Sequence, residues 1–331
     1  MADEPPRRRR REPGGGGEGG GRGERPQRRD PSARRAANDR RREASARRDQ
    51  LTTKSRQRRA GAGDQRRRPR SELWSRVLIA IPAAVIAIVF VDLGGTAFAG
   101  LMILLGWACL DELYRMLDRW RPAALAGFAA LAGMVIAARF GTQGQVLLVL
   151  VAAVPAVFAL VIMRGERANA TVSIAGTLLG IYWIAIAFAH AELLRRLPHG
   201  GAILIDVLVG TFLGDTAAYL GGRAIGRRPL APELSPKKTV EGLFCGMLMA
   251  FVSVLVAGIF QAWLTTQHAL LIGLGVAIAA PVGDLFESLV KRDAGAKDTG
   301  TLFGAHGGAL DRLDSAIFTV VVGYYIWLGL H

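Results

Sequence analysis

Residues 288–314 read SLVKRDAGAKDTGTLFGAHGGALDRLD and lie between two apolar runs, at 268–289 and 314–330. These 27 residues contain four Lys or Arg, four Asp, one His and five Gly. An apolar run of about 20 residues is long enough to cross a bilayer as a helix. The stretch therefore predicts two membrane helices joined by a dense polar loop, and this loop is where we expect the chemistry to take place.

The same apolar pattern extends back along the chain. The candidate membrane spans are nine, at about 74–92, 94–110, 122–139, 145–163, 170–190, 202–220, 242–262, 268–289 and 314–330. Only helices and closed β-barrels can cross lipid, and runs this long without alternation of polar and apolar residues exclude a barrel. The predicted fold class is therefore all-α: a polytopic integral membrane protein with about nine transmembrane helices.

The first 70 residues differ sharply in composition from the rest. Residues 1–70 hold 24 Lys or Arg against 10 Asp or Glu, whereas residues 71–331 hold 18 against 17. With hardly any aliphatic side chain, the first segment cannot bury enough apolar surface to offset its chain entropy. We therefore expect a disordered, Arg/Gly-rich cytoplasmic arm over 1–70 that contacts anionic lipid, followed by a membrane-embedded domain over 71–331.

Two alternative interpretations concern this N-terminal part. Arg/Gly-rich arms also bind RNA, but no aromatic residue that could stack on a base is interleaved here, so no nucleic-acid partner is expected. The sequence Ala97-Phe98-Ala99 after the first span is similar to a signal-peptidase site. A cleaved signal is disfavoured because the basic lead is too long and eight further spans follow.

The positions of the loop cations predict the orientation in the membrane. If the arm is cytoplasmic, the cytoplasmic loops carry 14 Lys or Arg, and the outer loops carry only Arg139, Arg195 and Arg196. This split places the N-terminus and both long polar loops in the cytoplasm and the C-terminus outside. The stretch 192–199, ELLRRLPH, does not fit the rule and is interpreted as an interfacial helix.

Asp284 lies within the eighth predicted span, in the sequence AAPVGDLFESLVKR. A carboxylate at membrane depth costs about 2.5 to 3.5 kcal/mol on insertion scales, so its retention indicates function. Pro281 leaves a backbone carbonyl unpaired nearby, which makes this part of the span irregular. On a helix, Asp284, Ser288 and Lys291 share one face, which then presents a carboxylate, a hydroxyl and an ammonium.

A second pair of carboxylates, Asp311 and Asp314, stands at the other end of the loop, one turn apart if the ninth helix begins near 308–310. Gly307 and Gly308 would let the backbone approach a phosphate, and free N–H groups of a first helical turn favour anions. Carboxylates that converge with phosphate-binding cations favour a magnesium nucleotide site. The alternative, simple salt bridges to neighbouring Lys and Arg, explains the whole cluster poorly.

A third polar patch follows the sixth span. It contains Asp215 in GDTAAY and then the run Ser235–Gly242, SPKKTVEG. Hydroxyls and lysines of this run could bind phosphate, and Pro236 favours a turn before the seventh helix. The alternative is a positively charged anchor with Glu241 near a helix N-terminus.

The spacing S-x-x-K-R-x4-K-D-x-G-x-L-x3-H-G-G-x2-D-R-L-D resembles the signature of the phosphatidate cytidylyltransferase family, and so do the D-x-x-A-Y-x-x-G-R and S-P-K-K-T-x-E-G runs. The resemblance covers 215–242 and 284–314 closely. It implies an enzyme of a bacterial-type inner membrane that transfers CMP from CTP to phosphatidic acid, releases pyrophosphate and uses Mg²⁺. It leaves a second cation and a homodimer open.

The resemblance also implies roles for individual residues. Asp284 and Asp311 would bind the metal. The other residues expected in catalysis are Lys297, Asp298 and Asp314. The expected substrate-binding residues are Asp215, Ser235, Lys237, Lys238, Thr239, Ser288, Lys291, Arg292, His306, Gly307, Gly308 and Arg312. The chain departs from the family pattern at Ala309, where a larger aliphatic residue is usual, and this affects local packing rather than chemistry.

The expected mechanism is in-line attack of a phosphatidate oxygen on the α-phosphorus of CTP. Positioning and charge neutralisation supply most of the acceleration of such a reaction. A phosphate monoester is already anionic at pH 7, so His306 is not needed as a base and would donate to phosphate or orient its turn.

Three other functions explain the sequence less well. An ion transporter would explain acidic residues in spans, but the outer half of the spans is nearly uncharged. A polyprenyl-phosphate phosphotransferase would need Asp-rich loops of another pattern. A non-catalytic scaffold fits least, because buried charges without function are costly.

Overall fold

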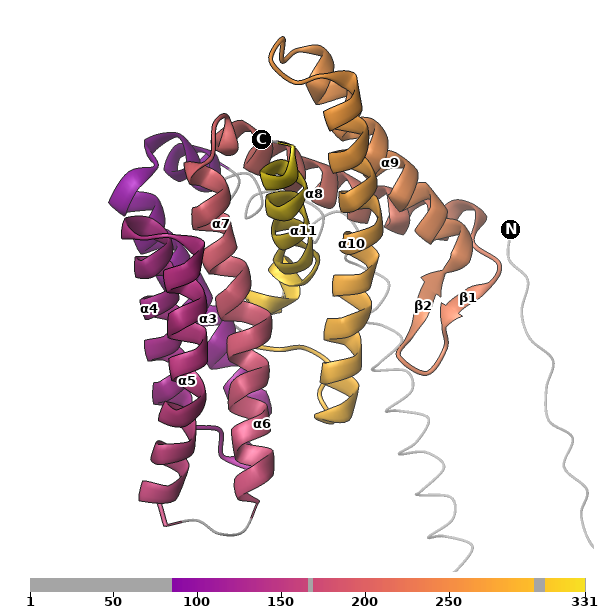
Figure 1. Ribbon diagram of the computed structural model, residues 1–331. Helices are drawn as coiled ribbons and strands as arrows, with labels where there is room; N and C mark the ends of the chain where they lie inside the picture. The colour runs from indigo at the N-terminus through magenta and orange to yellow at the C-terminus, as the bar shows by residue number, and fades with distance from the viewer. Residues whose placement is uncertain (1–84, 166–168, 301–306, 331) are drawn as a thin grey trace, which may run out of the picture. The chain divides into compact units, whose positions relative to one another are not determined.

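The structure is a computed structural model that describes residues 85–165, 169–300 and 307–330 (Figure 1). Residues 85–93 are helical. The helices that follow are α3 (Gly95–Met116), the short η1 (Asp118–Trp120), α4 (Ala124–Phe140), α5 (Gln143–Met163), α6 (Ala170–Gly180), the π-helical η2 (Ile181–Ala185), α7 (Ile186–Arg196), α8 (Gly200–Ile225), α9 (Val240–Ile259), α10 (Thr266–Asp293) and α11 (Leu310–Gly329). The predicted arm and most of the first predicted span lie outside the described residues.

Six stretches of the described chain are long and apolar enough to cross a membrane: α3, α5, the continuous helix from α6 to α7, α8, α9 and α10. The helix α4 is apolar but shorter, and α11 is not among the six. The chain is therefore an all-α, multi-pass membrane protein in outline. The count of nine spans stays a prediction.

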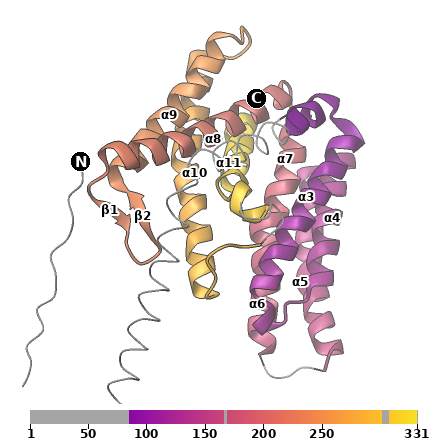
Figure 2. The same cartoon turned by 180° about the vertical axis from the view of Figure 1, so that it is seen from behind.

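The helices form two groups that α11 connects. In the first group, α4 packs against α3, α5 and α7. In the second, α9 packs against α8 and α10, and α10 packs against α11, which also contacts α7 and α8. Figures 1 and 2 show the C-terminal ends of α5 and α10 and the strands β1 and β2 toward the same end of the helices. We call this end the α10 end.

Tight packing occurs where α3, α4 and α7 meet, because each contributes side chains with no exposed surface, such as Leu113, Met134 and Leu194. By contrast, α5 exposes large apolar side chains such as Leu148 and Phe158. Apolar side chains exposed in this way are favourable in a membrane, because lipid tails rather than water surround the helix.

The opposite end of the molecule explains the arginines that did not fit the orientation rule. Residues 192–196 continue the α7 helix instead of forming a separate interfacial helix. Arg195 donates from Nε to the carbonyl oxygen of Val91 at 2.5 Å. Arg196 donates to the carbonyl oxygens of Ala138 and Gly141, the latter at 2.7 Å. These guanidinium groups satisfy carbonyls at helix C-termini, which have no partner within their own helix.

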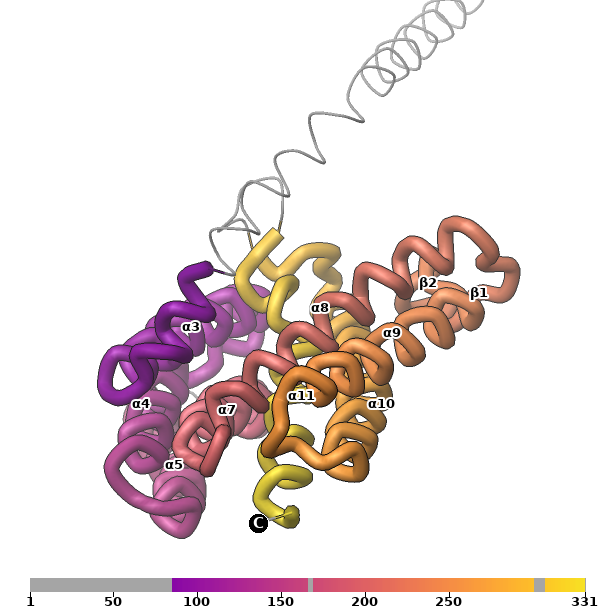
Figure 3. Tube along the Cα trace, turned by 90° about the horizontal axis from the view of Figure 1, so that it is seen from above, coloured from indigo at the N-terminus to yellow at the C-terminus, as the bar shows by residue number. Residues whose placement is uncertain are grey.

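The loop between α8 and α9 contains the strands β1 (Pro229–Ala231) and β2 (Ser235–Thr239), which pair antiparallel. The expected turn at Pro236 is therefore wrong: this proline lies within a strand. A two-stranded ribbon consists of edge strands only, where the missing N–H of proline is tolerated. Figure 3 shows α8 running from the α7 side of the molecule out to this hairpin.

Candidate active site

Three carboxylates from two helices converge near the α10 end. Ligand oxygens of Asp284 and Glu287 on α10 and of Asp314 on α11 lie within 4.8 Å of one another. The two helices approach closely here, because a Cβ added to Gly283 would lie 2.7 Å from the carbonyl oxygen of Asp314. We call these three residues the carboxylate cluster. The predicted meeting of Asp284 with the acidic pair of the last helix is thus confirmed for Asp314.

Two lysines neutralise the cluster. Lys238, the fourth residue of β2, places its Nζ 2.5 Å from Oδ2 of Asp284 and donates to Oγ of Ser288 at 3.4 Å. Lys291 lies 2.5 Å from Oε2 of Glu287. Asp284 and Ser288 therefore do share a helix face, as the sequence spacing predicts. The hairpin delivers a cation to that face from a distant part of the chain.

Asp311 is not one of the three residues of the carboxylate cluster. Its Oδ1 accepts a hydrogen bond from Nζ of Lys291 at 2.9 Å, and its Oδ2 accepts from the backbone N–H groups of Thr299 at 3.0 Å and Gly308 at 2.8 Å. Gly307 has φ of +84°, and a Cβ there would lie 2.7 Å from Oδ2 of Asp311. Asp311 as a metal ligand stays a prediction, while its contacts here organise the loop.

The carboxylate of Glu112, near the C-terminal end of α3, enters the site from another helix. It accepts hydrogen bonds from the backbone N–H groups of Ala309 and Leu310, both at 2.9 Å. The N–H groups that the sequence analysis assigns to an anionic ligand are therefore occupied by a protein carboxylate. The small side chain of Ala309 is consistent with this close approach, since Ala309 is buried.

Glu112 and Glu287 are the site residues that the sequence analysis missed. Glu287 could have been found, because it lies three residues after Asp284 and hence on the same helix face. Glu112 gives no comparable signal, because its partners are nearly 200 residues away in the chain.

The remaining predicted residues lie around the cluster. Asp215 on α8 accepts from Oγ of Ser315 at 3.5 Å. Arg292 donates from Nε to the carbonyl oxygen of Leu234 at 3.1 Å and so ties the hairpin to α10. Thr239 accepts from the N–H of Gly242 and begins α9. The side chains of Lys237, Lys297, Asp298 and Arg312 are exposed. Ser235 is half-buried, and His306 lies outside the described residues.

The donor set of the carboxylate cluster suits a hard divalent cation, which prefers carboxylate oxygens. Glu287 is 1% exposed, and its Oε1 has no hydrogen-bond partner among the described residues. A buried carboxylate oxygen without a partner is unfavourable. A cation bound beside Glu287 would remove that cost, so the residues present fit Mg²⁺.

An apolar groove of about 310 Å³ lies next to the cluster. Its lining residues are Leu179, Tyr182, Trp183, Ile186, Phe286, Ile317, Phe318, Val321 and Val322. On α11, Phe318 and Val321 follow Asp314 by four and seven residues, so the three share one face. The groove therefore starts one turn from the cluster and continues along the helices toward the opposite end.

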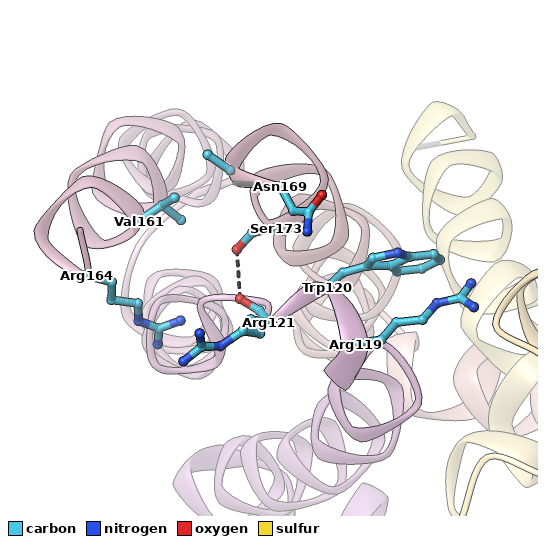
Figure 4. A pocket seen from close by; sticks show the side chains of 8 residues that line it. Arg119, Trp120, Arg121, Val161, Arg164, Asn169 and Ser173 are labelled. Atoms are coloured by element: carbon cyan, nitrogen blue, oxygen red, sulfur yellow. Dashed lines mark hydrogen bonds between the residues drawn. The ribbon is translucent and has the colours of Figure 1, made fainter. Parts of the chain in front are cut away.

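A second, smaller pocket lies between η1 and the ends of α5 and α6 (Figure 4). Arg121 and Arg164 lie at one edge of it, and Oγ of Ser173 donates to the carbonyl oxygen of Arg121 at 2.7 Å. Arg119 stacks over the Trp120 ring and donates to the carbonyl oxygen of Asp293 at 2.8 Å. This basic pocket is therefore joined to the last residue of α10, although none of its residues was predicted as a site residue.

Comparisons with known proteins identify similar chains. A model of the cytidylyltransferase family matches residues 74–329. The chain is 44% identical over 150 residues to the Escherichia coli K12 protein named "Uncharacterized protein YnbB", over 43% of this chain and 50% of that protein. It is 39% identical over 144 residues to the phosphatidate cytidylyltransferase of Synechocystis, over 42% and 46% of the two chains.

A longer alignment relates the chain to the phosphatidate cytidylyltransferase of Bacillus subtilis. The two are 30% identical over 272 residues, which cover 77% of this chain and 97% of the relative. The chain thus spans about half the length of the E. coli and Synechocystis relatives and nearly all of the B. subtilis one.

Proposed function

Since the chain belongs to the cytidylyltransferase family, we propose that it transfers CMP from CTP to phosphatidic acid and releases CDP-diacylglycerol and pyrophosphate. This is a reaction of phospholipid biosynthesis. The names of the Synechocystis and B. subtilis relatives support this pair of substrates.

The observation that carries the proposal is the carboxylate cluster, with its two lysines, at one end of membrane helices. Its oxygens lie within 4.8 Å of one another, and Lys238 and Lys291 each contact one of them. A nucleotide triphosphate and a lipid phosphate are both anions, so their reaction needs cations held between them. A cluster at the end of membrane helices can meet a water-soluble nucleotide and a lipid headgroup together.

In the proposed reaction, a phosphate oxygen of phosphatidic acid forms a bond to the α-phosphorus of CTP. The bond from that phosphorus to the oxygen that bridges to the β-phosphorus breaks, and its electron pair leaves with pyrophosphate. The attacking phosphate is already anionic at pH 7, so no protein base has to remove a proton. The residues act by holding the two phosphates in line and by neutralising charge.

Particular residues fit these tasks. Asp284, Glu287 and Asp314 would hold Mg²⁺, which when bound supplies positive charge to the phosphate oxygens. Lys238 and Lys291 already carry their ammonium groups to the cluster and would bind phosphate oxygens in exchange for a carboxylate. For Asp311 to bind the metal as a further ligand, its carboxylate would have to give up some of its present hydrogen-bond donors.

The apolar groove beside the cluster suits the acyl chains of the lipid substrate. Its walls along α6, η2 and α11 are almost entirely hydrocarbon or aromatic. Because the groove starts one helical turn from Asp314, a lipid headgroup at the cluster would direct its chains into it. A water-soluble acceptor would gain nothing from such a surface.

The proposed location is a bacterial-type inner membrane with the α10 end on the cytoplasmic side. The cations of this end support the orientation by the positive-inside rule. The proposal places the N-terminal arm in the cytoplasm with the active-site loops and the C-terminus outside. Association of two copies and a second cation stay predictions.

A direct assay tests the function. Purified full-length protein in detergent is incubated with phosphatidic acid, Mg²⁺ and CTP labelled at the α-phosphorus, and the lipid fraction is counted. We expect a labelled lipid, an equal amount of pyrophosphate, and loss of both when a chelator removes divalent cations. Absence of labelled lipid, with turnover of a sugar nucleotide or ion flux in vesicles instead, would overturn the assignment.

A further inference from the structure

Glu112 stands out among the buried polar groups because it belongs to no predicted motif. It lies in α3 with 6% of its surface exposed, whereas its neighbour Asp111 is only half-buried and pairs with Arg115. A carboxylate is buried at considerable cost unless hydrogen-bond donors surround it. The donors that surround Glu112 therefore indicate its structural role.

The donors come from both sides of the loop that joins α10 to α11. On the α11 side, Ala309 and Leu310 donate their backbone N–H groups to Oε1 and Oε2 of Glu112. On the α10 side, Oγ1 of Thr299 donates to Oε2 at 3.2 Å. One carboxylate of α3 therefore joins two parts of another segment and covers the first N–H groups of α11, where negative charge is favourable.

The glycines of the loop fit around this side chain. A Cβ on Gly308 would lie 2.1 Å from Oε2 of Glu112, and one on Gly300 would lie 2.8 Å from its carboxylate. Both distances are too short for a real contact. A larger residue at either position would therefore have to displace the carboxylate of Glu112.

The start of α11 decides where Asp314 points. Asp314 follows Leu310 by four residues, so it lies about one turn into the helix. Its carboxylate reaches Asp284 and Glu287 only if the first turn of α11 begins at the right place. Glu112 sets that place through the N–H groups of Ala309 and Leu310.

We propose that Glu112 is a positioning residue, which fixes the start of α11 and thereby holds Asp314 in the carboxylate cluster. The positioning role of Glu112 does not depend on the proposed function. Only the expected effect on turnover rests on that function. Glu112 does not touch the cluster in this structure and acts through α11.

The test replaces Glu112 by glutamine in the full-length protein. The amide keeps the size of the side chain, but its NH₂ group faces an N–H donor instead of accepting from it. We expect the Mn²⁺ affinity, measured by electron paramagnetic resonance with the metal alone, to fall about 10- to 100-fold. Turnover should fall by a similar factor, and amide hydrogen exchange at Ala309 and Leu310 should accelerate.

The matched control is Glu192→Gln, which changes a glutamate of 1% exposure at the opposite end. It should leave Mn²⁺ affinity within about twofold. If Glu112→Gln does not fold, Thr299→Val removes one of the three bonds and should give a smaller loss in the same measurements. Unchanged Mn²⁺ affinity in a folded Glu112→Gln protein contradicts the proposal. Because Mn²⁺ binding requires no turnover, this result is separate from a failure of wild-type protein to make labelled lipid.

Discussion

The two ends of the helices hold the same kinds of charged residue but pair them differently. At the α10 end, Lys238 and Lys291 contact the carboxylates of Asp284 and Glu287. At the opposite end, Arg195 and Arg196 contact backbone carbonyl oxygens of helix C-termini. Each end also buries a glutamate with 1% exposure, Glu287 or Glu192.

The contacts of the lysines at the α10 end can be exchanged for contacts with a ligand, whereas those of the arginines at the opposite end are fixed. A carbonyl oxygen at a helix end stays where it is, so an arginine that satisfies it contributes to stability. Lysines between several carboxylates can be replaced by a metal ion or can turn to a phosphate. Buried charge by itself is therefore a poor indicator of an active site. The group with which the charge pairs is a better indicator.

The strongest test of the comparison changes one aspartate at each end. Asp284→Asn should lower turnover at least about 1000-fold, because a ligand of the proposed metal is lost. Asp206→Asn changes an aspartate that accepts from Gln261 at 2.9 Å, and turnover should stay near normal. The measurement is the labelled-lipid assay on protein that elutes as a single species. Similar turnover rates for the two variants would contradict the assignment of the active site to the α10 end.

Lys238→Ala addresses the exchangeable cation. Turnover should fall about 100-fold, because the ammonium proposed to bind phosphate is removed. The melting temperature should change little, since Lys238 stands on a hairpin outside the packed core. Lys237→Ala is the neighbouring control, and its exposed side chain should matter much less. Equal losses in the two variants would point to general attraction of anions instead of a specific contact.

Arg196→Ala should show the reverse pattern. Loss of its bonds to the carbonyls of Ala138 and Gly141 should cost about 2 kcal/mol of stability. The melting midpoint in detergent should fall by about 5 °C. Turnover, measured well below that midpoint, should be unchanged. A variant that is fully stable but inactive would show that the fixed end takes part in the reaction.

The smallest effect is expected from removing residues 1–65. The arm is predicted to be disordered and lies outside the residues that the structure describes. Turnover in detergent should remain within about twofold, while binding to vesicles rich in anionic lipid should weaken at low salt. An inactive truncated protein would assign the arm a role in the site.

The sequence predicts much of the helical fold, because apolar runs of membrane length are a strong signal. The predicted span 145–163 corresponds to α5, and 268–289 lies within α10. Helix ends were placed less well, since α3 and α10 continue through charged residues such as Glu112 and Lys291 that a hydropathy criterion excludes. The hairpin was missed because strands of three and five residues are too short to show an alternating pattern.

The site was predictable only where its geometry is local. Helical spacing correctly places Asp284 and Ser288 on one face, and the same argument would have included Glu287. Glu112 could not be found in this way, because its contact with Ala309 depends on how α3 packs beside α11. Likewise, no local pattern indicates that Arg196 reaches the end of α4.

The β1–β2 hairpin has one further consequence. A ribbon of two strands has little stability alone, so its position depends on its ties to the helices. These are the bond from Arg292 to Leu234, the Lys238–Asp284 ion pair, and the N–H groups of Arg227 and Arg228 on Oε2 of Glu241. If Lys238 leaves Asp284 for a substrate phosphate, as proposed, the hairpin loses this tie to α10 and gains one to the substrate. Trypsin, which cuts after lysine, would then report substrate binding as a changed rate of cleavage at the hairpin.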